Sequence, residues 1–427
     1  MLVTGCWLLN NLVYPDYRLP LIHYYQILME RRKFIKYAGA GAAAGLFMLP
    51  RTDAEEFRGT DELEYHRITS IRFTTVKLNY PRQVGKNSQL DIHGFGPESG
   101  IHILYTDQGA SGWGLNRGSE KILTEKFELI KGKSLAELMD PASGLFSPDI
   151  EGFDFSLFDL AGKILEKPVY RLLGKRKPLT FPCYSGMIYF DDLEPAGNPA
   201  GPDKILEECR WDYEYGYRQF KLKIGRGNRW MEKDKGLKRD IEITKLVHTN
   251  FPDCDILVDG NNGFTIEEFI RYLEGIEGIK LFWIEEPFHE TVEDYAKLYS
   301  WLKMHDQFTL LADGEAKPDE KVLRQLGAQK IITVFLQDIV SLGFTKWISF
   351  IKEIKQMGIL SSPHAWGSAI KTNYISHLAG AFGTTATIEG VTCTSDDVDL
   401  TDYKLRKGNL IPSSKPGFGM DLLKKIP

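Results

Sequence analysis

Cysteine is scarce in this chain of 427 residues, and an excess of positive charge is absent. The cysteines form no C-x-x-C pair and no His/Cys spacing typical of zinc, so we expect buried thiols and neither a disulfide framework nor a zinc centre. These cysteines are Cys6, Cys183, Cys209, Cys254 and Cys393. A formal net charge of -5 provides no basic patch, which argues against a nucleic-acid partner. With 43% hydrophobic residues, the chain is long enough for one large domain and a smaller one.

The N-terminal region lacks a segment long enough to span a bilayer, because its apolar run ends after Tyr37 to Leu49. The basic string RRKFIK at residues 31–36 precedes this run, as in signal peptides, and it resembles the twin-arginine export motif. We therefore expect residues 29–54 to be a signal peptide and the mature protein to be exported to the periplasm without a membrane anchor. Residues 1–28 are interpreted as an extension upstream of a start at Met29. The alternative is an exposed basic tail.

Two hydrophobic patterns divide the rest of the chain. Apolar and polar residues alternate over residues 64–115 and take helical spacing over 120–173, which indicates an α+β domain at residues 64–177. After Pro178, eight apolar strand cores alternate with helical segments, which predicts an α/β fold with a (β/α)8-type barrel over residues 178–394. Residues 395–427 have few apolar runs, and we expect them to pack on the first domain.

Three carboxylates end three successive strand cores of the predicted barrel. Asp259, Glu285 and Glu315 close the runs ILVDGN, LFWIEEP and TLLADGE, at intervals of 26 and 30 residues. A single acid after a strand is usually a helix N-cap. Three consecutive strand ends, however, gather their side chains at one end of a barrel. Oxygen ligands in that arrangement suit a hard cation such as Mg²⁺.

The other strand ends also carry polar side chains where a barrel interior should be apolar. Lys221 and Lys223 occupy alternate positions of FKLKI, so both point to the same face of their strand. Asp338, His364 and Glu389 end the sixth, seventh and eighth strand cores. The lysines could instead be solvated on an edge strand, and His364 alone could be a hydrogen-bonded core residue. A continuous ring of such groups, however, indicates a ligand site.

Seven ordered motifs resemble those of one enzyme family. They are FKLKIG, VDGNN, WIEEPF, DGE, DIVSLGFTKWI, SPHAWGS and IEG, and the helical string DLAGKILEKPVYRLLG precedes them. They identify the chain, from about residue 66 to about residue 420, as a member of the enolase superfamily, in the mandelate racemase/muconate lactonizing enzyme family. The resemblance implies a modified TIM barrel, an N-terminal α+β capping domain and a homo-oligomer. Ser341 stands where racemase relatives often carry a lysine.

The resemblance implies a magnesium site at the barrel end. Its Mg²⁺ ligands would be Asp259, Glu285 and Glu315. Asp313 competes with Glu315 as the third ligand, because relatives use either type of acid there. Glu286 and Asn261 would lie next to these ligands without binding the metal themselves.

The same resemblance implies acid and base groups on both faces of a substrate. Lys223 would be the base on one face, and His364, oriented by Asp338, would be the acid or base on the opposite face. Lys221 would lie near the substrate carboxylate, and Glu389 would hydrogen-bond it. Two neighbouring lysines beside a dication should disfavour each other's protonation, and the pairing with Asp338 should stabilise the charged form of His364.

The implied reaction begins with removal of the proton α to a carboxylate. This step creates an enediolate, which a bound metal stabilises. Loss of a β-hydroxyl would then give a 2-keto-3-deoxy acid, so we expect an acid-sugar dehydratase. Reprotonation on the far face would instead make the protein a racemase or epimerase, and a cycloisomerase is a further alternative. A non-catalytic sugar-acid binding protein is the alternative from another class, but it would need neither Lys223 nor His364.

Replacement of both Arg31 and Arg32 by lysine should stop export, because the twin-arginine address is read by a receptor rather than as simple charge. The measurement is the fraction of chain that loses its N-terminal segment and reaches the periplasmic fraction of an expressing bacterium. Arg51→Lys, outside the pair, is the matched control. Unchanged export of the double variant would contradict the signal-peptide assignment.

Overall fold

A computed structural model describes residues 60–175, 177–305, 307–315 and 317–424. The predicted upstream extension and signal peptide, residues 1–54, lie outside the described residues. None of the helices in the described part of the chain combines the length and apolar character needed to cross a membrane.

The first described part is an antiparallel sheet covered by helices. β1 (Ile68–Lys77), β2 (Glu98–Thr106) and β3 (Ser111–Leu115) pair in that order. α6 (Asp154–Ile164) lies very close to β3, where a Cβ on Gly114 would be 2.7 Å from the Phe155 Cβ atom. The other elements of this part are α3 (Glu62–Tyr65), α4 (Glu120–Phe127), α5 (Leu135–Leu138), β4 (Met139–Asp140), β5 (Gly144–Leu145), the 3₁₀ helix η1 (Pro148–Phe153) and α7 (Val169–Leu172).

The second part is a barrel of parallel strands. Six neighbouring pairs connect the strands from β6 to β12, and β13 pairs with β6. A parallel bridge from Ser361 to Thr385 links β12 to the segment before β13 and completes the ring. The eight strands coincide with the eight predicted strand cores, and the predicted fold class is confirmed. The strands are β6 (Phe181–Ile188), β7 (Gln219–Lys223), β8 (Asp255–Asp259), β9 (Leu281–Glu285), β10 (Leu310–Asp313), β11 (Val334–Phe335), β12 (Leu360–Ser361) and β13 (Ile388–Gly390).

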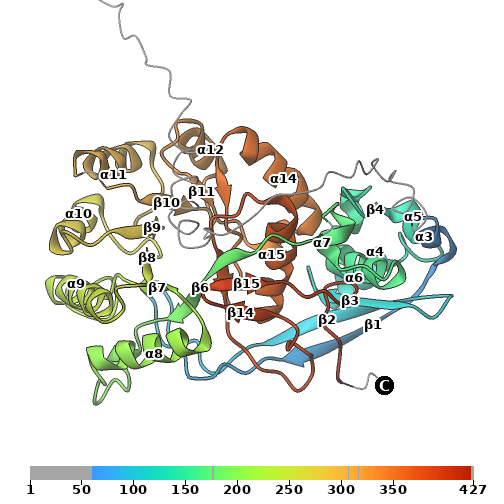
Figure 1. The fold of residues 1–427 in the computed structure, drawn as a ribbon, viewed down its shortest axis with the longest axis horizontal. Helices are drawn as coiled ribbons and strands as arrows, with labels where there is room; N and C mark the ends of the chain where they lie inside the picture. Colours follow the sequence, from blue (N-terminus) through green and yellow to red (C-terminus); the bar gives the residue numbers. More distant parts are fainter. Residues whose placement is uncertain (1–59, 176, 306, 316, 425–427) are drawn as a thin grey trace, which may run out of the picture. The chain divides into compact units, whose positions relative to one another are not determined.

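Helices follow the barrel strands and cover their outer side, as Figure 1 shows for α8 to α11 beside β7 to β10. Many begin at a side chain that accepts a backbone N–H bond. Thr265, for example, forms a reciprocal capping box with Glu268. The helices are α8 (Pro202–Tyr215), α9 (Lys233–Asn250), α10 (Ile266–Gly275), α11 (Val292–Met304), α12 (Glu320–Ala328), α13 (Ile339–Leu342), α14 (Phe344–Gln356) and α15 (Ala369–Phe382), with the 3₁₀ helix η2 at Asp191–Leu193.

The barrel interior changes from apolar to charged along the strands. A buried cluster that includes Tyr184, Leu257 and Trp283 fills the barrel interior before the strands reach their C-terminal ends. On β7, Phe220 and Leu222 belong to the core under the helices, so the alternating lysines Lys221 and Lys223 point inward. The strand period therefore directs charged side chains to the C-terminal end of the barrel, where TIM-barrel active sites lie.

The C-terminal segment bonds to both parts. β14 (Lys404–Arg406) and β15 (Asn409–Ile411) form a hairpin that pairs antiparallel with β6. Further along, the Met420 carbonyl accepts a 2.8 Å hydrogen bond from the Trp113 indole of β3. The segment therefore connects the sheet to the barrel.

Three aromatic rings lie where the sheet domain, the barrel and the C-terminal segment meet. Phe155 of α6 stacks on Tyr374 of α15, with ring centroids 4.2 Å apart. Phe418 lies 4.4 Å from the Tyr374 ring. Since offset aromatic packing stabilises beyond its buried area, this cluster should couple the unfolding of both parts.

Phe155→Ala should lower the free energy of unfolding by about 3–5 kcal/mol, because it removes a fully buried ring from this junction. Denaturant unfolding, followed by tryptophan fluorescence, measures the change. Phe146→Ala is the matched control, since Phe146 is 62% exposed and should cost less than about 0.5 kcal/mol. Equal costs for the two variants would refute the role of the junction.

Candidate active site

Three acids converge at the C-terminal end of the barrel. Asp259, Glu285 and Glu315 each offer a carboxylate oxygen, and these three atoms lie within 4.8 Å of one another. Asp259 and Glu285 end β8 and β9, whose paired register places them side by side. One oxygen of Glu285 and one of Glu315 are buried without a hydrogen-bond partner among the described residues. A hard cation would satisfy such oxygens, so the donor set fits Mg²⁺.

Glu315, and not Asp313, is the third member of this cluster. Asp313 is the last residue of β10, and its carboxylate accepts hydrogen bonds from the Tyr295 hydroxyl and, at 2.6 Å, from the Gly314 N–H. Tyr295 lies on α11, so Asp313 faces the helix layer. Gly314 then adopts a positive φ of 119°, and the turn carries Glu315 to the barrel end. Burial raises the pKa of Asp313 to about 7.

Lys221 connects acids from three strands. Its Nζ atom lies 3.2 Å from Asp259 Oδ2, 3.0 Å from Glu285 Oε1 and 3.1 Å from Glu389 Oε1. Burial acts to lower the pKa of Lys221, but the carboxylates of Glu285 and Glu389 raise it well above its usual value. Repulsion between the two lysines is expected to lower the pKa of Lys221. In the chain without a metal, the nearby carboxylates have the larger effect on the pKa of Lys221 and raise it.

Lys223 lies beside the same acids. Its Nζ donates a 2.5 Å hydrogen bond to Asp259 Oδ2, and it sits 5.1 Å from the centre of the Tyr189 ring. The side chain is 4% exposed, so the ammonium group reaches the site from within the barrel rather than from an edge strand.

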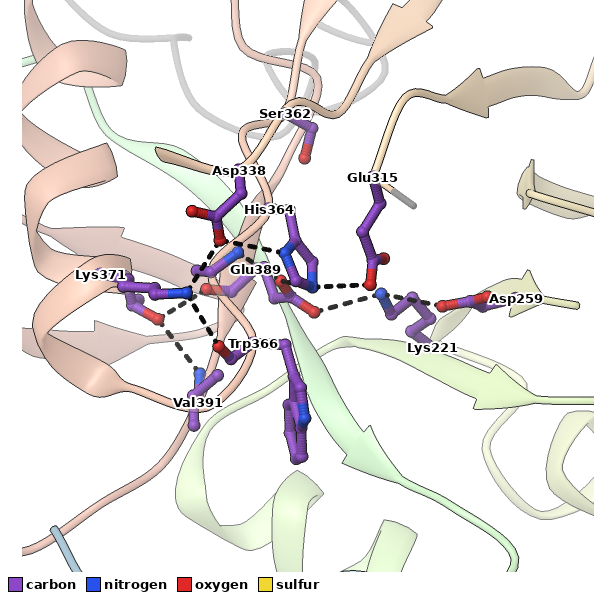
Figure 2. A network of polar contacts seen from close by, with 12 residues as sticks. Lys221, Asp259, Glu315, Asp338, Ser362, His364, Trp366, Lys371, Glu389 and Val391 are labelled. Atoms are coloured by element: carbon purple, nitrogen blue, oxygen red, sulfur yellow. Dashed lines mark hydrogen bonds and ion pairs between the residues drawn. The ribbon is translucent and has the colours of Figure 1, made fainter. Parts of the chain in front are cut away.

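His364 joins the acid cluster to Asp338 (Figure 2). Its Nε2 atom lies 3.0 Å from Glu315 Oε1, and its Nδ1 atom lies 3.2 Å from Asp338 Oδ2. Burial acts to lower the pKa of His364, but Glu315 and Glu389, together with the hydrogen bond to Asp338, raise it to about 10. Asp338 itself is fixed as the N-cap of α13, where it accepts the Val340 and Ser341 N–H groups.

Glu389 completes the group of predicted residues. It ends β13, accepts a 2.6 Å hydrogen bond from the Ala365 N–H and is 1% exposed. A Cβ on Gly186 would lie 2.9 Å from Glu389 Oε1, so β6 needs glycine beside this acid. The structure thus brings together all the residues proposed as ligands, bases or carboxylate contacts, namely Lys221, Lys223, Asp259, Glu285, Glu315, Asp338, His364 and Glu389.

Lys371 also belongs to this network, although its sequence position gave no sign of it. It comes from α15, and its Nζ donates to Asp338 Oδ2 at 2.8 Å and to the Trp366 carbonyl at 3.3 Å (Figure 2). Asp338 therefore accepts from a second cation in addition to His364. Lys371 lies on a helix and not at a strand end. The regular spacing of strand ends, which located the other residues, therefore could not predict it.

The loops behind the acids have unusual backbone geometry. Asn261 and Glu286, the two residues expected behind the metal ligands, have positive φ angles of 42° and 38°. Residues other than glycine adopt such angles mainly where surrounding contacts compel them, often at functional sites. Asn261 N–H donates to Asp259 Oδ1 at 2.9 Å, which restrains the first acid of the cluster.

A (β/α)8-type barrel whose strand ends bring three acids, two lysines and a histidine together defines an enzyme of the enolase superfamily. The family model "Enolase C-terminal domain-like" matches residues 204–426, more than half of the chain. The chain belongs to that family.

Comparisons with individual proteins narrow the kind of chemistry. A galacturonate dehydratase from a Geobacillus species, solved with D-galacturonate and 5-keto-4-deoxy-D-galacturonate, is 29% identical with a TM-score of 0.78, covering 84% of this chain and 95% of that one. A mandelate racemase/muconate lactonizing protein from a Geobacillus species, complexed with magnesium/tartrate, is 29% identical with a TM-score of 0.79, covering 84% and 93%. The arabinonate dehydratase of Saccharolobus solfataricus is 24% identical over 282 residues, 65% of this chain and 70% of that protein. Other relatives are an epimerase and a cycloisomerase. The protein is therefore an enzyme of the lyase or isomerase kind.

Glu315→Gln should weaken Mg²⁺ binding by more than about 10-fold, since loss of a ligand should cost at least as much as loss of a group behind it. Isothermal titration calorimetry with Mg²⁺ measures this affinity. Asp313→Asn is the matched control and should bind Mg²⁺ within about twofold of the parent, because Asp313 points to Tyr295. The opposite order of effects would make Asp313 the ligand.

Proposed function

We propose that this protein removes the proton α to the carboxylate of an acid sugar and dehydrates the resulting enediolate. The observation that carries this proposal is the placement of two basic side chains around one acid cluster. Lys223 contacts the cluster at Asp259, and His364 contacts it at Glu315. A substrate carboxylate held at the cluster would therefore have a proton acceptor and a proton donor on different sides.

Asp259, Glu285 and Glu315 would hold a magnesium ion. When bound, the ion would supply positive charge that neutralises the substrate carboxylate and the enediolate. A homologous structure complexed with magnesium/tartrate supports this choice of metal. If all are ionised, the four carboxylates exceed the two ammonium groups and the imidazolium by one negative charge, so a dication and a substrate carboxylate would together balance the site.

Each remaining residue has a role in moving or holding a proton. Lys223 takes the α-proton, and Lys221 and Glu389 contact the substrate carboxylate as charge builds on it. His364 protonates the departing β-hydroxyl from the other side. Asp338 fixes the orientation of the imidazole and stabilises its charged form, and Lys371 holds Asp338 in place.

The alternatives use the same first step. Racemisation, epimerisation and cycloisomerisation are the second candidates, because the relatives include an epimerase and a cycloisomerase. A binding protein without catalysis is disfavoured by the buried Lys223 and by the pairing of His364 with Asp338, which binding alone would not need. Export to the periplasm and assembly as a homo-oligomer also remain proposals.

Incubation with Mg²⁺ and a library of acid sugars in D₂O should yield a 2-keto-3-deoxy acid from at least one member. Keto-acid formation and α-deuterium uptake are both followed by NMR. Deuterium uptake without keto acid would favour a racemase or epimerase, and neither signal from any member would contradict the proposal. Chelation of the metal should abolish the reaction.

Two variants separate the roles of the bases in that experiment. Lys223→Ala should reduce both signals by about 10²–10⁴-fold, as expected on removal of a general base. His364→Asn should reduce keto-acid formation by a similar factor but leave α-deuterium uptake through Lys223. Lys297→Ala, on the surface of α11, is the matched control and should keep parental activity. Full turnover by Lys223→Ala would refute the assignment of the base.

A further inference from the structure

The segment between β1 and β2 is held against the barrel beside the active site. Ser88 Oγ donates to the Gly260 carbonyl at 2.7 Å, directly after Asp259. The Trp230 indole donates to the Asn87 carbonyl at 2.6 Å. A Cβ on Gly225 would lie 2.9 Å from the Ser88 Cβ atom, so the contact requires glycine on the barrel side. The segment is thus bonded to the barrel loops after β7 and β8.

This arrangement places His93 among aromatic rings at the strand ends. The His93 ring packs edge-on against Tyr189, at 4.9 Å, and against Trp366, at 5.3 Å. Tyr189 follows β6 directly, and Trp366 lies two residues after His364. The Tyr189 ring also lies 5.1 Å from Lys223 Nζ, so His93 and the proposed base contact the same ring.

The hydrogen bond to Trp366 determines the tautomer of His93. An indole N–H can only donate, and Trp366 Nε1 lies 3.3 Å from His93 Nδ1. Nδ1 is therefore the acceptor, and the neutral imidazole carries its proton on Nε2. Burial, and after it the charge of Lys223, lower the pKa of His93 to about 4 although Glu315 acts to raise it, which keeps the ring neutral near pH 7.

The Nε2–H group of His93 has nothing to donate to in the described part of the chain. Nε2 is buried and has no hydrogen-bond partner there. A buried donor without an acceptor is unfavourable, so such groups in native proteins usually meet water or a ligand. The ring packs on Tyr189, which also contacts Lys223, and on Trp366, which follows His364 by two residues, so His93 lies beside the proposed acid and base groups.

We propose that His93 is a specificity-determining residue that donates its Nε2–H to an oxygen on the part of the substrate beyond the reacting α-carbon. This inference rests on the proposed function. A hydroxyl or carboxylate oxygen of a polyhydroxylated acid is the acceptor that a neutral N–H group selects. The rings of Tyr189 and Trp366 contact the apolar C–H faces of the same portion. A short hydroxy acid without that oxygen leaves the donor unpaired and is disfavoured.

His93→Phe tests the proposal, because it keeps a ring between Tyr189 and Trp366 but removes the donor. In the Mg²⁺-loaded enzyme, kcat/KM is measured for the longest acid sugar that the D₂O library identifies, and α-deuterium uptake for D-glycerate. The variant should lose about 10–100-fold on the long acid and stay within about twofold on D-glycerate. Equal losses on both acids, or none on the long acid, would overturn the role of His93. His248→Phe, near the end of α9, is the matched control.

The tautomer of His93 can be measured without turnover, both in the parent protein and in Trp366→Phe. Histidine labelled with ¹⁵N should report a neutral Nε2–H tautomer for His93 in the parent at pH 7, with the resonance assigned from its loss in His93→Phe. Trp366→Phe should shift the tautomer toward Nδ1–H and lower kcat/KM for the long acid. A proton on Nδ1 in the parent would overturn the inference even in an active dehydratase. A correct tautomer in a protein that exchanges no α-proton would instead defeat the proposed function, and this inference with it.

Discussion

The rest of the site depends on the ion pairs between the ammonium group of Lys221 and the surrounding carboxylates. The ammonium group is buried within 3.2 Å of carboxylates on β8, β9 and β13, so one cation connects strands from different parts of the barrel. A buried charge is tolerated only when it is paired and hydrogen-bonded. Without Lys221, Asp259, Glu285 and Glu389 would repel one another across a small space. With it, the three side chains stay close together, as a divalent metal site requires.

The acids and cations form a chain that extends beyond this group. His364 links Glu315 to Asp338, and Asp338 is held by both the α13 N-terminus and Lys371. Lys371 in turn bonds the Trp366 carbonyl, and the Trp366 indole bonds His93. Residues that would handle protons and a residue that would select the substrate are therefore connected through one loop after β12. A shift of that loop would affect both tasks together.

Much of the fold and of the site followed from periodicity. Eight apolar strand cores alternating with helices predicted the barrel, because parallel strands need crossover helices and bury both faces. Acids at successive strand ends predicted the metal site, since the C-terminal ends of barrel strands converge. The pair Lys221 and Lys223 was assigned inward by the two-residue period of a strand. These conclusions rest on local patterns and on topology, which the sequence carries directly.

Contacts between residues distant in the sequence needed the tertiary structure. Asp313 and Glu315 are two residues apart on the same motif, and only the position of Tyr295 and the turn at Gly314 showed which acid enters the cluster. Lys371 and His93 reach the site from a helix and from the segment between β1 and β2, where no strand period applies. The sequence by itself determined the barrel, its acidic end and the kind of chemistry, because those depend on repeated local spacing. The tertiary structure alone decided the third acid, the second partner of Asp338 and the free donor of His93, because side-chain direction and long-range packing are set by the whole fold.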